Sequence, residues 1–173
     1  VAVQYAAYAG TRAAVTWVPE KYSYEEPRNV VSDPAGSDKM ERIRSAAVEV
    51  LKAVSPSVAG AGGAPATAEG QVLADGFDRF FAMSGEPVPS WVHRMLPAKY
   101  DYASEYTEVT LAPPADGETY GDHEDLTVTV QHTLYLSVPY ANRLFSLGSG
   151  GVAFSGGGGY GTEVEATCTL INE

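Results

Sequence analysis

Residues 126–138, LTVTVQHTLYLSV, decide the fold, because polar and apolar side chains alternate along nearly the whole stretch. Successive side chains of a β-strand point to opposite faces of the sheet, so this pattern predicts a strand with one buried and one solvated face. The expected buried set is Leu126, Val128, Val130, His132, Leu134, Leu136 and Val138. The expected solvated set is Thr127, Thr129, Gln131, Thr133, Tyr135 and Ser137.

Two other stretches alternate in the same way, residues 105–111 (EYTEVTL) and residues 162–172 (TEVEATCTLIN). In the first, Thr107, Val109 and Leu111 are expected to share one face. In the second, the buried face is expected to hold Val164, Ala166, Cys168 and Leu170. One apolar and one polar face are typical of an antiparallel sheet that is covered on one side only. The sheet therefore needs helices as its cover.

Residues 37–56, SDKMERIRSAAVEVLKAVSP, predict an amphipathic helix that supplies part of this cover. Ser37 is a favourable N-cap residue. Apolar side chains recur at spacings of three and four on one stripe, at Met40, Ile43, Ala47, Val50, Leu51 and Val54. Residues 71–107 predict one or two short helices laid on the core and broken by prolines. Their apolar residues are Phe77, Phe80, Phe81, Trp91 and Met95, and the break is at Pro87 and Pro89.

The first seventeen residues, VAVQYAAYAGTRAAVTW, predict another helix, which carries no charge before Arg12. One interpretation is an ordinary buried helix of the core. The other is the lower part of a longer membrane-inserted helix, with about 10 to 15 further apolar residues before Val1. Small side chains would then let neighbouring helices approach closely. The assembly contact is expected at Ala2, Tyr5, Ala6, Ala9, Gly10 and Ala13.

Together these elements predict an α+β fold. An N-terminal apolar helix and a second amphipathic helix are expected to pack on a C-terminal antiparallel β-sheet, in a pilin-like arrangement. The expected division is an assembly or membrane-proximal helix over residues 1–18 and a single globular head over residues 19–173.

The composition excludes some classes of function. The chain carries 11 lysines and arginines against 22 aspartates and glutamates, which gives a formal net charge of −11. Nucleic-acid binding needs clustered cations, and the basic residues here are scattered, so we expect no nucleic-acid partner. Cys168 is the only cysteine, which rules out a disulfide within the chain and a zinc site built from several thiolates.

No pattern of catalytic residues is found, and we expect no enzyme. The three histidines, at positions 93, 123 and 132, are far apart, and His132 is expected to be a hydrogen-bonded core residue. The glycine-rich residues 148–161 contain no phosphate-binding motif and favour a long hairpin connection. No cofactor is therefore expected, apart from the ion considered next.

The loop ADGETYGDHEDLT, residues 115–127, gathers carboxylates that could hold Ca²⁺. The candidate ligands are Asp116, Glu118, Asp122 and Glu124, with Asp125 beside them. Aligned on an EF-hand loop, however, Tyr120 and Thr127 occupy two positions that should provide ligands. A solvated hairpin loop between two strands is favoured, and calcium is the alternative.

The order of these pieces resembles the TadE/TadG-like minor pilins, or pseudopilins, of tight-adherence pilus systems. In that family a hydrophobic N-terminal helix runs into an alanine-rich segment around an arginine, which residues 9–14 (AGTRAA) match. An A-x-x-x-T-x-V strand is matched by Ala103, Thr107 and Val109. A V-x-V strand, a later V-P and a short apolar segment are matched by Val128, Val130, Val138, Pro139, Leu144 and Phe145.

The resemblance implies a non-catalytic structural subunit of a bacterial pilus, pseudopilus or surface filament. Such a subunit assembles through its N-terminal helix with other pilin subunits or with itself. It also implies an extracytoplasmic location, with anchoring in the inner membrane before assembly. Two alternatives stay open: a self-assembling virion or extracellular filament protein, and a secreted module that binds a ligand or calcium through the acidic loop.

Overall fold

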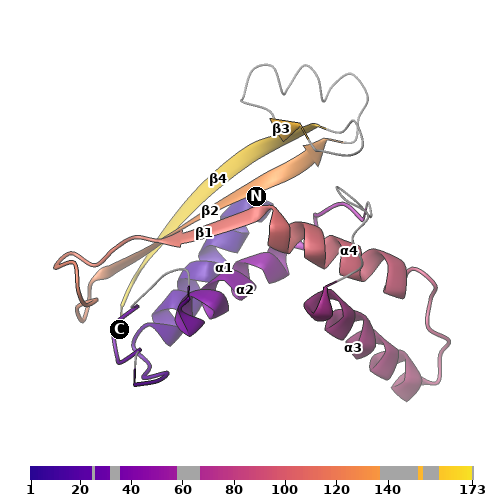
Figure 1. The fold of residues 1–173 in the computed structure, drawn as a ribbon, viewed down its shortest axis with the longest axis horizontal. Helices are drawn as coiled ribbons and strands as arrows, with labels where there is room; N and C mark the ends of the chain where they lie inside the picture. Colours follow the sequence, from indigo (N-terminus) through magenta and orange to yellow (C-terminus); the bar gives the residue numbers. More distant parts are fainter. Residues whose placement is uncertain (25, 32–35, 58–66, 137–151, 154–159, 173) are drawn as a thin grey trace. The chain divides into compact units, whose positions relative to one another are not determined.

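The computed structural model describes residues 1–24, 26–31, 36–57, 67–136, 152–153 and 160–172. Four helices precede the strands within these residues (Figure 1). The helices are α1 (Ala2–Trp17), α2 (Asp38–Leu51), α3 (Ala68–Ser84) and α4 (Val92–Glu105). The strands are β1 (Thr107–Leu111), β2 (Asp125–Leu136), β3 (Val152–Ala153) and β4 (Tyr160–Ile171). The predicted α+β class, with late strands, is confirmed.

The chain forms two compact units. The first comprises Val1–Leu51, Thr107–His132 and Val164–Glu173, and the second comprises Lys52–Tyr106 and Thr133–Glu163. This division differs from the expected one at residue 18, because α1 belongs to the first unit together with α2 and parts of the sheet. The N-terminal helix packs within a globular unit and is not set apart from a head.

The strand order of the sheet is β1-β2-β4-β3. Strand β1 runs antiparallel to β2, with Thr107 opposite His132 and Leu111 opposite Val128. The predicted buried face is confirmed at Leu126, Val128, Val130 and His132, which are buried. Leu134, which was expected on the same face, is half-buried, as are its neighbours Thr133 and Tyr135. The side chain of Leu136, together with Ser137 and Val138, lies outside the described residues, as do Pro139, Leu144, Phe145 and most of the glycine-rich stretch.

The solvated face of the sheet in the first unit is polar and paired across strands. Thr127 and Thr129 of β2 share hydrogen bonds with Thr169 and Thr167 of β4, at oxygen–oxygen distances of 2.8 and 3.0 Å. The predicted alternation along β4 is confirmed, because Glu163, Glu165, Thr167 and Thr169 are exposed and the residues between them are half-buried. Cross-strand pairs of this kind stabilise an antiparallel sheet.

Helices α1 and α2 lie side by side against the apolar face of the sheet in the first unit (Figure 1). Ala6, Ala7 and Ala14 of α1 are fully buried, as are Ile43, Ala47 and Leu51 of α2. The N-cap prediction is confirmed, because the amide of Met40 donates to Ser37 Oγ at 3.1 Å. Helix α2 ends three residues earlier than its apolar stripe implied, and Val54 is half-exposed.

A fully buried lysine closes the connection between α1 and α2. Lys39 Nζ donates to the carbonyl oxygens of Val18, Pro27 and Val30 at 2.9, 2.7 and 3.0 Å. Burial lowers the pKa of Lys39, while the nearby Glu26 carboxylate opposes the shift. Three carbonyl acceptors satisfy the three N–H bonds of an ammonium group, so Lys39 holds the loop to the start of α2.

The second unit contains the α3–α4 hairpin, which confirms two helices separated by the segment with Pro87 and Pro89. Both helices are longer than expected. Thr67 is the N-cap of α3, and its side chain accepts a hydrogen bond from the Gly70 amide. The expectation that Phe80 lies on the core is wrong, because its side chain is 64% exposed.

Candidate assembly surface

Helix α1 has two distinct faces. Its inner face, Val3, Ala6, Ala7, Gly10, Thr11 and Ala14, is buried within the first unit. Thr11 is polar, but its hydroxyl is satisfied on this face because it donates a hydrogen bond to the Ala7 carbonyl at 2.7 Å. Small residues let α1 approach α2 and the sheet closely.

Gly10 lies where α1 comes nearest to its neighbours. A Cβ atom at this position would lie 3.3 Å from Val128 Cγ1 of β2 and 3.7 Å from the Ile43 carbonyl of α2. Ala6 and Gly10, which were expected to contact another copy, therefore use their small size inside their own chain. The expectation is corrected for these two residues, because both are buried in the first unit and Gly10 faces Val128 of β2 and Ile43 of α2.

The outer face of α1 carries Tyr5, Tyr8 and Arg12 together with the exposed Gln4 and Thr16. Half-exposed residues lie beside them, at Ala2, Ala9 and Ala13. Tyr5 is 60% exposed and Tyr8 is 41% exposed. Their rings stack with centroids 6.3 Å apart, and the Arg12 guanidinium lies 6.0 Å from the centre of the Tyr8 ring. Two large amphipathic rings and one cation thus form a continuous row on the surface.

Tyr8 and Arg12 are the members of this row that the expected contact set omits. Tyr5, Tyr8 and Arg12 stand at positions i, i+3 and i+7, which share one side of a helix. That spacing was visible in the sequence. The row of Tyr5, Tyr8 and Arg12 lies opposite the buried face of α1. The small residues that were expected to make the contact are therefore divided between the two faces: Ala6 and Gly10 are buried, and Ala2, Ala9 and Ala13 are half-exposed.

The acidic hairpin loop organises itself through two of its carboxylates. Asp116 Oδ1 accepts hydrogen bonds from the amides of Glu118 and Thr119 at 2.9 and 2.8 Å, which lowers the pKa of this carboxyl. Glu124 accepts from the amides of Ala115 and Gly121, both at 2.6 Å. Both carboxylates therefore serve the turn, as the hairpin interpretation expects.

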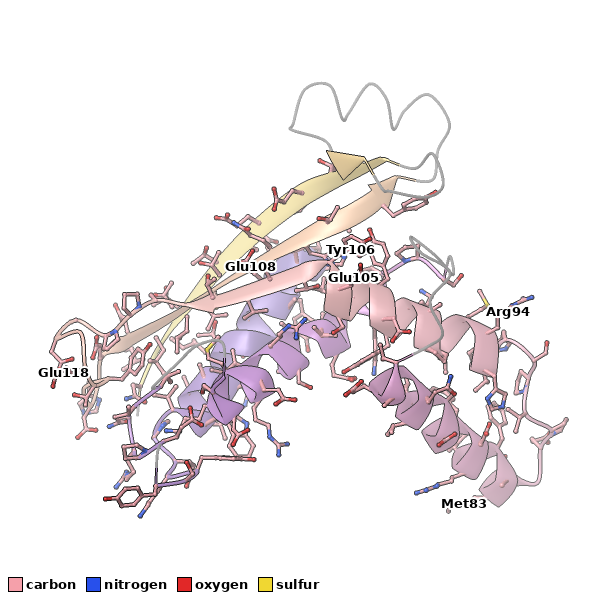
Figure 2. All side chains as sticks on the ribbon, in the orientation of Figure 1. Met83, Arg94, Glu105, Tyr106, Glu108 and Glu118 are labelled. Carbon is pink, nitrogen blue, oxygen red and sulfur yellow. The ribbon has the colours of Figure 1, made fainter. Side chains whose placement is uncertain are left out.

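The other candidate calcium ligands, Glu118 and Asp122, are exposed, and Figure 2 places Glu118 at the outer end of the hairpin. Across the described part of the chain, no three histidine, cysteine, aspartate or glutamate side chains converge in a group that could hold a metal ion. Calcium binding stays a prediction for this loop.

Tyr120 anchors the loop, and its substitution by phenylalanine should change how stability depends on pH. The buried hydroxyl donates to the Ala112 carbonyl at 2.8 Å, and burial, with a contribution from Glu124, raises the pKa of Tyr120 to about 12. A pKa above the ordinary 10.0 favours the neutral phenol in the folded state. Its contribution is complete below pH 10 and is lost as pH rises toward 12.

Tyr120→Phe should therefore lower the free energy of unfolding at neutral pH by about 1 kcal/mol, the value of one hydrogen bond. The deficit should shrink above pH 10. Urea unfolding at a series of pH values measures both quantities, with Tyr24→Phe at a 94% exposed tyrosine as the control. A deficit that stays constant up to pH 12 would contradict the assignment.

The three histidines lie in three unlike settings, as expected. His132 is a core residue of β2, and its Nδ1 shares a hydrogen bond of 2.8 Å with Thr107 Oγ1. His123 lies in the hairpin loop, and His93 pairs with Asp78 at 3.1 Å at the end of the α3–α4 hairpin. These three histidines therefore do not form a single site.

A second exposed apolar row runs along α3. Val72, Phe80 and Met83 are 69%, 64% and 89% exposed. Figure 2 shows Met83 at the end of α3. Within the residues the structure describes, none of the helices combines the length and apolarity needed to cross a membrane.

The exposed aromatic row of α1 is thus the strongest candidate for a functional surface among the described residues. No family model matches the chain, and neither the curated proteins nor the solved structures provide a match.

Proposed function

We propose that the chain is a non-catalytic structural subunit of an extracytoplasmic bacterial pilus, pseudopilus or surface filament, of the kind that it resembles. The subunit assembles through the outer face of α1, with copies of itself or with other filament subunits, and it is held at the inner membrane before assembly. The pilin-like interpretation of the α+β fold belongs to this proposal.

The observation that carries the proposal is the two-faced character of α1. The inner face is occupied by α2 and β2, while Tyr5 and Tyr8 are 60% and 41% exposed on the opposite face. Tyrosine and arginine are enriched where proteins meet, because they combine large contact area with polar groups. Rings held by stacking lose little conformational entropy when a partner covers them.

The orientation of α1 also fits a subunit that assembles through a helix. Because the inner face is already packed in the first unit, the outer face can be covered without unfolding that unit. Ala9 and Ala13 border the aromatic row and are half-exposed, so a second helix can approach closely on that side.

Substitution of both tyrosines tests the proposal. Tyr5→Asp combined with Tyr8→Asp should raise the concentration at which the protein self-associates by at least tenfold, because two carboxylates would have to be desolvated. Sedimentation velocity from micromolar to millimolar concentrations measures this. Tyr24→Asp, at a 94% exposed tyrosine outside α1, is the matched control.

The unfolding midpoint of the double variant should stay close to that of the wild type, since both side chains are exposed. If the double variant associates as the wild type does, the outer face of α1 is not the assembly contact. A wild-type protein that stays monomeric over the whole range would contradict self-assembly.

A further inference from the structure

The apolar arc of α3 is wider than its packing requires. Ala74 is fully buried, and Phe77 and Phe81 are half-buried on the same side of the helix. Val72, Phe80 and Met83 extend the arc into solvent. Singly exposed apolar residues are ordinary on a protein surface, but several of them on one side of a helix indicate a candidate contact site.

The exposed row of α3 has a regular spacing and an open centre. Glu69, Val72, Gly76, Phe80 and Met83 lie on one side of the helix. A Cβ atom added at Gly76 would meet nothing within 4 Å. The row therefore has an acidic residue at its start, a gap without a side chain in the middle and large apolar residues beyond the gap.

The outer face of α1 has the complementary order. Measured from Arg12 towards the N-terminus, Tyr8, Tyr5 and Val1 follow at separations of four, seven and eleven residues. Measured from Glu69 towards the C-terminus, Val72, Gly76 and Phe80 follow at separations of three, seven and eleven. At 1.5 Å per residue the two rows match in length over about 16 Å.

The charges are complementary as well. Arg12 is the one charged residue of α1, whereas α3 carries Glu69, Asp75 and Asp78 against Arg79. An antiparallel pairing that places Arg12 next to Glu69 brings Tyr5 opposite the open position at Gly76. The cation of one row then meets the carboxylate of the other, and the ring of Tyr5 meets the gap.

We propose that the partner of the α3 row is the outer face of α1 on a second copy of the chain, docked antiparallel with Arg12 against Glu69. This inference rests on the proposed function, and it names the surface that α1 meets. Two different patches in contact form a heterologous interface, which leaves one patch of each kind open on every dimer. Copies can therefore add one after another, as a filament requires.

Complementation between two variants tests the pairing. Tyr5→Asp/Tyr8→Asp removes the α1 patch, and Phe80→Asp/Met83→Asp removes the α3 patch. Each variant alone should stay monomeric, whereas their mixture should form dimers and nothing larger, because only one intact patch of each kind is present. Sedimentation velocity measures the products, with Val54→Asp, another half-exposed apolar position, as the control.

Charge exchange provides the second test and changes only exposed residues. Arg12→Glu should raise the dissociation constant roughly tenfold, as should Glu69→Arg, because each replaces an attraction by a repulsion. The double variant should return to within about threefold of the wild type. Arg94→Glu and Glu118→Arg, both exposed, are the control substitutions.

The outcomes separate this inference from the proposed function. If the α3 variant associates like the wild type while the α1 variant does not, the pairing is overturned and assembly through α1 stands. If the α1 variant still self-associates, the pairing and assembly through α1 both fall. If the wild type stays monomeric, the pairing and self-assembly fall, and only assembly with other filament subunits is left. If the mixture stays monomeric, or if charge exchange does not restore binding, the antiparallel pairing is wrong.

Discussion

Replacing Lys39 with methionine is expected to lower the free energy of unfolding by about 3 kcal/mol. Methionine keeps the length of the side chain but removes the three N–H groups that bind the carbonyls of Val18, Pro27 and Val30. The carbonyls of Val18 and Pro27 still accept hydrogen bonds from the amides of Asn29 and Val30. The cost therefore comes from the three lost charge-assisted bonds and from any carbonyl left without a donor, at roughly 1–3 kcal/mol when it is buried. The loss is reduced because methionine avoids the cost of desolvating an ammonium ion.

Urea unfolding followed by circular dichroism measures the effect, with Lys21→Met at an exposed lysine as the control. The control should stay within about 0.5 kcal/mol of the wild type. Hydrogen exchange at the Asn29 amide, which donates to the Val18 carbonyl at 2.8 Å, should accelerate in Lys39→Met. Unchanged stability in Lys39→Met would show that the three carbonyls do not depend on this lysine.

Gly10→Leu should have a comparable effect, a loss of about 3 kcal/mol or more. Its Cβ atom would already lie 3.3 Å from Val128 Cγ1, and the rest of the side chain would have to enter the packed layer between α1, α2 and β2. The free energy of unfolding of Gly10→Ala should be close to that of the wild type, since the better helix propensity of alanine offsets a single tight contact.

Thermal unfolding measures both Gly10 variants, and Thr16→Leu places the same side chain on the exposed side of α1 as a control. The result also decides which face Gly10 serves. A Gly10→Leu protein as stable as the wild type but unable to self-associate would return Gly10 to the contact between copies that the sequence predicted.

Much of the fold follows from the sequence because its strands have unlike faces. Val128 and Val130 alternate with threonines, and a shift by one residue would bury the hydroxyls and expose the valines. Thr107, Val109 and Leu111 follow the same rule in β1. Helix α2 was equally predictable, because Ser37 is a favourable N-cap residue and Ile43 and Ala47 indicate the buried side.

The candidate surface was less predictable, because a row of small residues lets a helix approach a neighbour closely but does not identify that neighbour. Ala6 and Gly10 fit a contact with another copy as well as they fit the interior of their own unit, and only the fold distinguishes the two. Lys39 was unpredictable for a related reason. Its acceptors are backbone carbonyls from three separate positions, which leave no trace in residue type.

The polar side of the sheet also influences which contacts between copies are permitted. Glu108 lies on β1, an outer strand of the sheet (Figure 2). Its side chain is exposed, as are those of Glu163 and Glu165 on β4. If two copies joined edge to edge through β1, their Glu108 carboxylates would be brought close together, which disfavours that contact. At high protein concentration, this repulsion disfavours amyloid-like stacking of sheets from different copies.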